Sequence, residues 1–282
     1  MNRIGTVIGD RFRLDELIGR GAMAEVYRAL DLETQAFVAL KILRHQHVTD
    51  GNALARFARE ADVQARLRHR NVAALLATGV TKDKYEPYLA VELLRGRSLR
   101  SVIKAEGRVL PRRAASYAWQ ALQGLAAVHE AGVLHRDLKP ANIMLEPSPG
   151  PIERVVLIDF GFATFEGSAK LTLQGTVVGS LTYISPERLR AEDPDQRSDI
   201  YGLGVVLFEL LIGRPPFIAD DDFDLINMHL NDDPPSVGAA SPSAALLDPI
   251  IGRALAKNPG DRYANANEMA AAVEHAATQL TE

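Results

Sequence analysis

Apolar residues recur at strand-like spacing along the first ninety positions of the chain. The predicted strands cover residues 13–19, 25–30, 37–43, 72–79 and 88–94. A glycine-containing turn separates the first two strands. Residues 95–98, Arg-Gly-Arg-Ser, have the composition of a linker. This part of the chain is therefore predicted to form a small β-sheet.

One segment among these strands has helical spacing instead. Its apolar residues recur every three to four positions and mark one face of an amphipathic helix, at Leu54, Phe57, Ala58, Ala61 and Ala65. After residue 98 the pattern becomes mainly helical. A long helix is predicted over residues 111–131, because Pro111 suits a first helical turn and Gly132 follows the end.

Two short strands and four further helices complete the pattern. The strands cover residues 143–145 and 155–158, and the helices cover residues 197–211, 223–230, 244–256 and 266–280. The predicted fold class is α+β. A small antiparallel sheet with one helix is followed by a larger, mainly helical part.

The composition is that of an ordinary globular protein, with 47% hydrophobic and 24% charged residues among 282. The net charge of −4 gives no indication of nucleic acid binding. Cysteine is absent, which excludes disulfides and cysteine-zinc sites and fits a cytoplasmic location. The N-terminus lacks the apolar run of a signal peptide. The longest apolar stretch, residues 200–212, contains Glu209 and is too short for a membrane segment, so a buried helix is predicted there.

Two short motifs between apolar segments carry the residues of a phosphoryl-transfer site. The first is His-Arg-Asp-Leu-Lys-Pro-Ala-Asn at residues 135–142. The second is Asp-Phe-Gly at residues 159–161, and its aspartate lies 22 positions after Asp137. Together they supply one base, one phosphate-facing cation and two metal ligands. This is the set of groups that moves the terminal phosphoryl group of ATP onto a hydroxyl.

On these motifs the chain resembles the eukaryotic-like serine/threonine protein kinases, in particular their bacterial branch. The resemblance covers about residues 10–275, as an N-lobe of about 10–94 and a C-lobe of about 95–275, with terminal extensions at 1–9 and 276–282. It implies the bilobal protein kinase fold, with the chemistry in the crease between the lobes. It also implies an enzyme that phosphorylates serine and threonine hydroxyls of proteins with ATP.

The resemblance assigns phosphate contacts to the N-lobe. Gly19 and Gly21 lie in Gly-Arg-Gly-Ala-Met-Ala-Glu-Val, where backbone N–H groups can bind phosphate oxygens, although Ala24 replaces the third glycine of the usual pattern. Lys41, in Val-Ala-Leu-Lys, is expected to contact the α- and β-phosphates of ATP. Glu60, 19 residues further on, is expected to pair with Lys41 in the active conformation only.

The resemblance also assigns the adenine contacts. Val26 and Ala39 are expected to sandwich the ring, and the backbones of Glu92 and Leu94 to hydrogen-bond it. Val91 stands at the gatekeeper position, where a small side chain leaves a pocket open to bulky inhibitors. The full predicted set is Ile18, Val26, Ala39, Val91, Glu92, Leu94 and Met144.

In the catalytic loop, Asp137 is expected to accept the proton of the substrate hydroxyl. Lys139 is expected to neutralise charge that develops on the transferring group. Asn142 and Asp159 are expected to hold Mg²⁺, which Mn²⁺ could replace, because both side chains offer oxygen ligands. Two further residues, His135 and Phe160, are expected to pack beneath the site.

Three further residues are expected to stabilise the active fold. The segment from Asp159 to Glu187 corresponds to the activation segment and ends in Ser-Pro-Glu, a variant of the usual Ala-Pro-Glu. Glu187 is expected to pair with Arg262, in Lys-Asn-Pro-Gly-Asp-Arg. Asp199 is expected to accept hydrogen bonds from the backbone of the catalytic loop.

Regulation is expected to act through the activation segment. A phosphothreonine adds about two negative charges and could pair with Arg136, which would order the segment. Thr172 is the first candidate and Thr176 the second, whereas Gln174 occupies a position where bacterial relatives often carry a second threonine. The expected partners are ATP and protein substrates, and a homodimer would allow phosphorylation in trans.

Lys139 within Asp-Leu-Lys-Pro-x-Asn favours serine and threonine over tyrosine as acceptors. Ser98 and Ala141 stand at two positions where kinases that prefer basic substrates carry acids, so the resemblance does not imply selection for arginine.

Three alternatives have different consequences. A pseudokinase scaffold would bind ATP without turnover, yet every catalytic position is filled; Gln64, one turn after Glu60, stands where relatives often place an apolar residue. A small-molecule kinase would share the chemistry but usually lacks the Asp-Phe-Gly to Ser-Pro-Glu segment. A binding module without nucleotide does not explain Lys41, Asp137 and Asp159 together.

Overall fold

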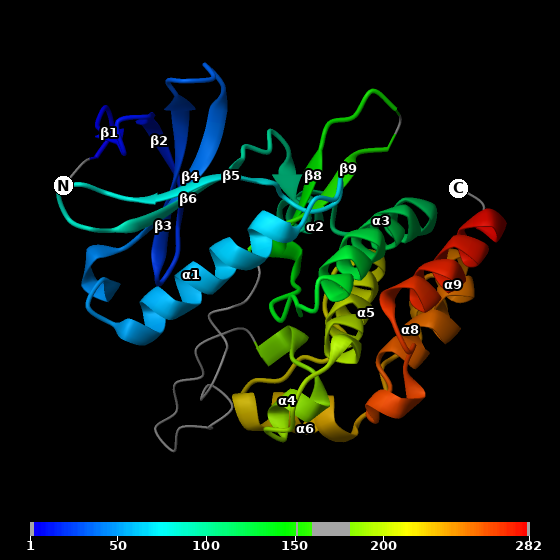
Figure 1. The fold of residues 1–282 in the computed structure, drawn as a ribbon. Helices are drawn as coiled ribbons and strands as arrows, with labels where there is room; N and C mark the ends of the chain where they lie inside the picture. Colours follow the sequence, from blue (N-terminus) through cyan, green and yellow to red (C-terminus); the bar gives the residue numbers. More distant parts are fainter. Residues whose placement is uncertain (1–2, 151, 160–180, 281–282) are drawn as a thin grey trace. The chain divides into compact units, whose positions relative to one another are not determined.

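The computed structural model describes residues 3–150, 152–159 and 181–280. The chain forms two compact units, Met1–Arg95 and Gly96–Glu282, which run from blue to cyan and from green to red in Figure 1. Each unit has a hydrophobic core of its own.

Unit 1 is a six-stranded antiparallel sheet with one α-helix among its described residues. The strand order is β1-β2-β3-β4-β6-β5. The elements are β1 (Val7–Ile8), β2 (Phe12–Arg20), β3 (Ala24–Asp31), β4 (Phe37–Leu43), the 3₁₀ turn η1 (His45–His47), α1 (Gly51–Arg66), β5 (Leu75–Val80) and β6 (Pro87–Glu92). The first four strands follow one another as hairpins.

The two faces of this sheet bury different side chains, because successive residues of a strand point to opposite faces. Leu40 and Ile42 of β4 belong to a core that covers one face. Leu43, on the opposite face with Lys41, packs with Phe57 of α1. Helix α1 therefore lies on the same face of the sheet as Lys41.

Helix α1 begins where its sequence supplies a cap. The Asp50 carboxylate accepts hydrogen bonds from the backbone N–H groups of Asn52 and Ala53, which have no partner within the helix. The amphipathic helix that the sequence predicts in this region is confirmed.

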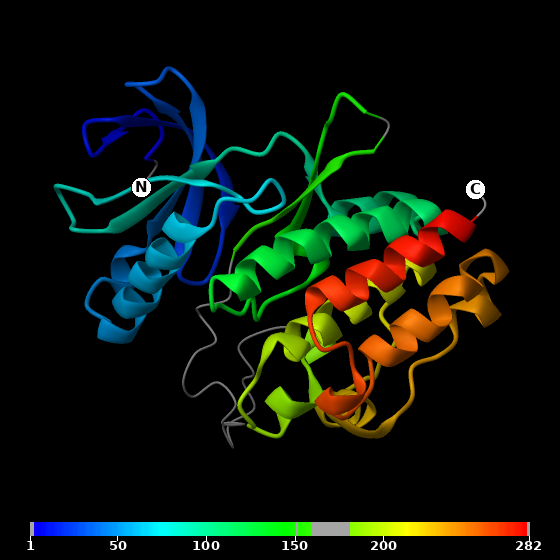
Figure 2. The same cartoon turned by 45° about the vertical axis from the view of Figure 1, so that its right-hand side comes forward.

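Unit 2 is mainly helical and is built around α5 (Gln196–Ile212), as the long apolar stretch predicts. Helices α3 (Pro111–Glu130) and α9 (Ala266–Gln279) lie side by side, green and red in Figure 2. The other helices are α2 (Leu99–Glu106), α4 (Pro186–Leu189), α6 (Asp222–Asn231), α7 (Val237–Ala240) and α8 (Asp248–Ala254). The 3₁₀ turns are η2 (Pro140–Asn142), η4 (Leu181–Tyr183), η5 (Pro242–Leu247) and η6 (Pro259–Asp261).

A small antiparallel sheet, β7-β8-β9, brings together residues that lie far apart in the sequence. Its strands are β7 (Arg97–Ser98), β8 (Ile143–Glu146) and β9 (Arg154–Leu157). Ile143 pairs with Leu157, and the N–H of Ile158 donates to the carbonyl of Asn142 at 3.0 Å. Asn142, the residue before β8, and Asp159, after β9, are thereby brought to the same end of the hairpin.

Two sequence predictions need correction. The boundary between the two units falls within residues 95–98, where a linker was predicted, but Arg97 and Ser98 form β7 and pair with β8. The Ser98 hydroxyl then caps α2, a helix that was not predicted. The single helix predicted over residues 244–256 is divided into η5 and α8. Pro249 lies in the first turn of α8 and has no N–H to donate to residue 245, so an α-helix cannot run through this point with its bonds intact.

Within the residues that the structure describes, no helix is both long enough and apolar enough to cross a membrane.

Candidate active site

The catalytic loop holds one carboxylate oxygen between two donors. Lys139 Nζ lies 2.7 Å from Asp137 Oδ2, and Asn142 Nδ2 lies 2.8 Å from the same oxygen. Asn142 Nδ2 also donates to the backbone carbonyl of Asp137 at 2.9 Å. These contacts orient the Asp137 carboxylate and leave Oδ1 as the oxygen that can accept a substrate proton.

The backbone of this loop is anchored by Asp199 of α5, as the sequence predicts. Asp199 Oδ2 accepts from the N–H of His135 at 2.8 Å, and Oδ1 accepts from the N–H of Arg136 at 2.7 Å. His129 Nε2 lies 2.9 Å from Asp199 Oδ2. Burial alone would raise the pKa of Asp199, but these contacts outweigh it and lower the pKa.

The loop adopts an unfavourable backbone conformation at Arg136, whose φ of 64° is rare for a residue with a side chain. The Arg136 N–H is bound by Asp199, and its carbonyl accepts from Arg188 at 2.7 Å. The surroundings therefore hold the strained residue on both sides, as is common at functional sites.

The predicted metal ligands lie at the same end of the β8–β9 hairpin, where the N–H of Ile158 donates to the carbonyl of Asn142 and Asp159 is the next residue. Asn142 is 6% exposed, and its amide nitrogen is turned to Asp137, so the amide oxygen is the atom that remains to bind a cation. Asp159 is exposed and has a φ of 52°, a conformation that aspartate tolerates better than most residues. Two oxygen donors of this kind at one end of a hairpin fit Mg²⁺, which completes its shell with water and phosphate oxygens.

In unit 1, the ion pair that the sequence predicts is present. Lys41 Nζ lies 2.6 Å from Glu60 Oε1, and both side chains are largely buried. Strand pairing places Val26 opposite Lys41 and Gly19 opposite Val26, so the glycine turn and the lysine share one face of the sheet.

Three of the predicted adenine contacts of unit 1, Val26, Ala39 and Val91, lie on the same face of the sheet as Lys41. Two others do not, because Ile18 lies at a bulge of β2 and the Glu92 side chain is on the opposite face. Ala39 pairs with Val91 across β4 and β6. Ile18 is exposed on β2. The N–H of Glu92 donates to the carbonyl of Ala74 at 2.9 Å, so a contact from Glu92 to adenine would use its carbonyl oxygen.

Met144, the predicted adenine contact of unit 2, is half-buried on β8. It points away from the face on which its neighbours Ile143 and Leu145 are fully buried.

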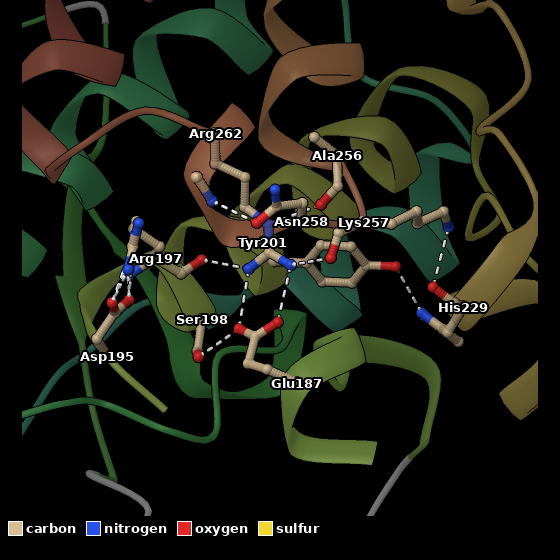
Figure 3. Close-up of polar contacts among 11 residues, drawn as sticks. Glu187, Asp195, Arg197, Ser198, Tyr201, His229, Ala256, Lys257, Asn258 and Arg262 are labelled. Atoms are coloured by element: carbon tan, nitrogen blue, oxygen red, sulfur yellow. Dashed lines mark hydrogen bonds and ion pairs between the residues drawn. The ribbon is translucent and has the colours of Figure 1, made fainter. Parts of the chain in front are cut away.

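The predicted pair of Glu187 and Arg262 forms the centre of a buried network (Figure 3). Arg262 contacts both carboxylate oxygens of Glu187, at 2.9 and 2.8 Å, and the Ser198 hydroxyl donates to the same carboxylate at 2.5 Å. Burial alone would raise the pKa of Glu187, but Arg262 and Ser198 outweigh it and lower the pKa to about 2. This network joins α4 to α5 and to the segment before α9.

The network continues toward α6 (Figure 3). The Arg262 guanidinium lies over the ring of Tyr201, 4.9 Å from its centroid, and Tyr201 Oη lies 2.8 Å from His229 Nδ1. Burial lowers the pKa of His229 to about 4, so this histidine is neutral at pH 7. Lys257 Nζ donates to the carbonyls of Met228 and His229, and burial lowers its pKa to about 8.

Several residues of the site were not predicted. His129 binds Asp199, Arg188 binds the Arg136 carbonyl and Ser198 binds Glu187. Only His129 carries a sequence signal, as a polar residue in the last turn of a mainly apolar helix. Phe160, Thr172 and Thr176 lie outside the described residues, and His135 is fully buried as predicted.

Comparison with known proteins agrees with this geometry. A family model described as protein kinase domain matches residues 12–276. The probable serine/threonine-protein kinase PknB of Corynebacterium glutamicum is 40% identical over 288 residues, which cover 96% of this chain and 44% of that protein. PknB of Mycobacterium tuberculosis is 38% identical, over 94% of this chain and 42% of that protein. The chain thus spans less than half the length of these curated relatives.

A crystal structure of the M. tuberculosis PknI kinase domain matches with a TM-score of 0.77 and 26% identity, over 99% of this chain and 100% of that one. The predicted kinase fold is confirmed. This chain belongs to the protein kinase domain family.

Proposed function

We propose that this chain transfers the γ-phosphoryl group of ATP to serine and threonine hydroxyls of proteins. The observation that carries the proposal is the catalytic loop, where Lys139 and Asn142 hold the Asp137 carboxylate and Asp199 anchors the backbone. A rigidly held base beside a cation is what phosphoryl transfer requires, because catalysis of this reaction is mainly positioning and charge stabilisation.

Each side chain of the loop has a separate task in this proposal. Asp137 Oδ1 accepts the proton of the substrate hydroxyl and aligns the oxygen for attack on the γ-phosphorus. Lys139 moves part of its contact from Asp137 to the transferring group as charge develops there. Arg136 is held by its backbone, so its side chain can bind a phosphorylated residue of the activation segment.

Nucleotide binding is assigned to the predicted residues of unit 1 and to Met144 of unit 2. Lys41, fixed by Glu60, binds the α- and β-phosphates, and the backbone of Gly19 and Gly21 covers them. Mg²⁺ bound by Asn142 and Asp159 would neutralise phosphate charge. Mn²⁺ meets the same oxygen donors.

The serine/threonine preference rests on Lys139 in the catalytic loop and on the names of the relatives, which are serine/threonine kinases. We further propose that Thr172 or Thr176 is phosphorylated, in trans within a homodimer, and pairs with Arg136. The absence of cysteine suits work in a reducing cytoplasm.

The test is incubation of the purified protein with ATP and Mg²⁺ beside Asp137→Asn, which keeps the shape of the side chain but removes the base. Phosphoserine or phosphothreonine is expected in the original protein, with a rate about 10²–10⁴-fold lower in the variant. Asp233→Asn, an exposed acid outside the site, is the matched control and should be unchanged. Nucleotide binding without transfer in the original protein, or equal transfer by Asp137→Asn, would refute the proposal.

A further inference from the structure

Helix α1 carries an unusual pair of polar residues on its buried face. Its buried positions are Ala53, Phe57, Glu60 and Gln64, which follow one another at helical spacing. Glu60 is paired with Lys41. Gln64, only 4% exposed, lies one turn further along the same stripe.

The amide of Gln64 is poorly satisfied in this position. Its Nε2 reaches the carbonyl of Ala73 at 3.4 Å, the long end of the hydrogen-bond range. Its Oε1 is buried and has no hydrogen-bond partner among the residues that the structure describes. A buried acceptor without a partner keeps the desolvation cost of the group and gains nothing in return.

The apolar attachment of α1 is also small. Of its buried residues only Phe57 belongs to the cluster with Ala24, Leu43 and Leu89, and Leu54 and Ala61 pack at its margin half-buried. Phe57 lies before Glu60 in the helix, whereas Gln64 lies after it. Beyond Glu60, the helix packs with the half-buried Ala61, a small side chain, and buries the polar Gln64. The second half of α1, which must hold Glu60 against Lys41, therefore has no large buried apolar residue of its own.

We propose that Gln64 is a positioning residue that weakens the seating of α1 and so lowers the fraction of molecules in which Glu60 holds Lys41. The inference rests on the proposed function for its catalytic consequence only. Seating α1 with Gln64 buried costs the desolvation of its amide, whereas releasing the helix returns the amide to water. Molecules with the Lys41–Glu60 pair formed are thus in equilibrium with molecules in which it is not formed.

The experiment replaces Gln64 with Leu and, separately, with Met, which have similar volume and lack the amide donor and acceptor. Hydrogen exchange of the α1 amides should slow, because an apolar residue favours the seated helix. The affinity for ATP with Mg²⁺, measured by calorimetry, and kcat/KM should rise about threefold to tenfold as the paired state becomes more populated. Ala65→Leu adds an apolar residue to the exposed face of the same helix and is the matched control, with neither change expected.

Combining the Gln64 variants with Glu60→Gln distinguishes an effect that acts through the Lys41–Glu60 pair from a merely structural effect on α1. There the slower exchange should persist, while the gain in affinity and kcat/KM should vanish, because the pair no longer exists. Equal gains in both backgrounds, or faster α1 exchange in Gln64→Leu and Gln64→Met alike, would overturn the inference. If the protein transfers no phosphate at all, the proposed function fails, yet exchange and ATP affinity still decide the role of Gln64.

Discussion

Helices α1 and α5 each hold predicted site residues of their own unit and are built in opposite ways. Helix α5 buries fourteen of its seventeen residues, and its acids Asp199 and Glu209 are both satisfied. Arg100 and Tyr183 each contact Glu209 at 2.7 Å. Helix α1 buries four of its sixteen residues, and two of these are polar.

This difference separates a fixed support, α5 with Asp199, from an adjustable support, α1 with Glu60. Asp199 holds the catalytic loop from a helix that cannot move without exposing a large apolar surface. Glu60 holds Lys41 from a helix with one large apolar anchor, Phe57. Asp137, the proposed base, therefore lies in a loop anchored by a buried helix. The position of Lys41, the proposed phosphate contact, depends instead on the position of α1.

The largest effect is expected on the fixed side, from Glu187→Gln. The change leaves the buried Arg262 charge without its partner and should cost about 3–5 kcal/mol of unfolding free energy. Urea unfolding followed by circular dichroism measures this. The exposed pair of Lys82 and Asp10 provides the control, because Asp10→Asn should cause no measurable loss. Similar losses in both variants would show that burial does not distinguish the pairs.

On the adjustable side, Lys41→Met should lower kcat/KM about 10²–10³-fold, the range for removing one positioned cationic or hydrogen-bonding donor at a transition state. The melting temperature should fall less than in Glu187→Gln, because the weakly held helix can move and return the unpaired Glu60 carboxylate to water. Kinetics with a peptide acceptor and differential scanning fluorimetry give the two readouts. A large drop in melting temperature would contradict the distinction between the two helices.

The stability of unit 2 should also depend on pH through Glu187. Its pKa is lowered from an ordinary value of 4.5 to about 2, so the folded state prefers the charged form. This contribution is complete above about pH 5 and is lost as the pH falls toward 2. The stability difference between the original protein and Glu187→Gln should therefore shrink from pH 6 to pH 3. A difference that stays constant across this interval would contradict the assignment.

The smallest effect is expected at Val91, which packs at the margin of the apolar cluster around Phe57. Its small side chain predicts a pocket behind the adenine that accepts bulky inhibitors. Val91→Met should weaken such inhibitors severalfold while ATP turnover changes little. Unchanged inhibition would count against the gatekeeper prediction.

The sequence predicted specific contacts as well as the fold class. The pairs Lys41–Glu60 and Glu187–Arg262 were expected from family motifs, and both are present. Element boundaries were less secure. Pro249 and Ser98 are local signals that were overlooked. The apolar pattern around Pro249 suggested one continuous helix, and the polar composition around Ser98 suggested a linker.

The sequence by itself therefore determined where most strands, helices and catalytic motifs lie, because residue spacing and capping are properties of neighbouring residues. Only the tertiary structure decided the polar contacts that no motif predicts. His129 reaches Asp199 across 70 positions, whereas the Gln64 oxygen finds no partner among the described residues. Hydrogen bonds between segments that are distant in the sequence depend on how the helices and strands pack. The spacing of neighbouring residues does not determine this packing.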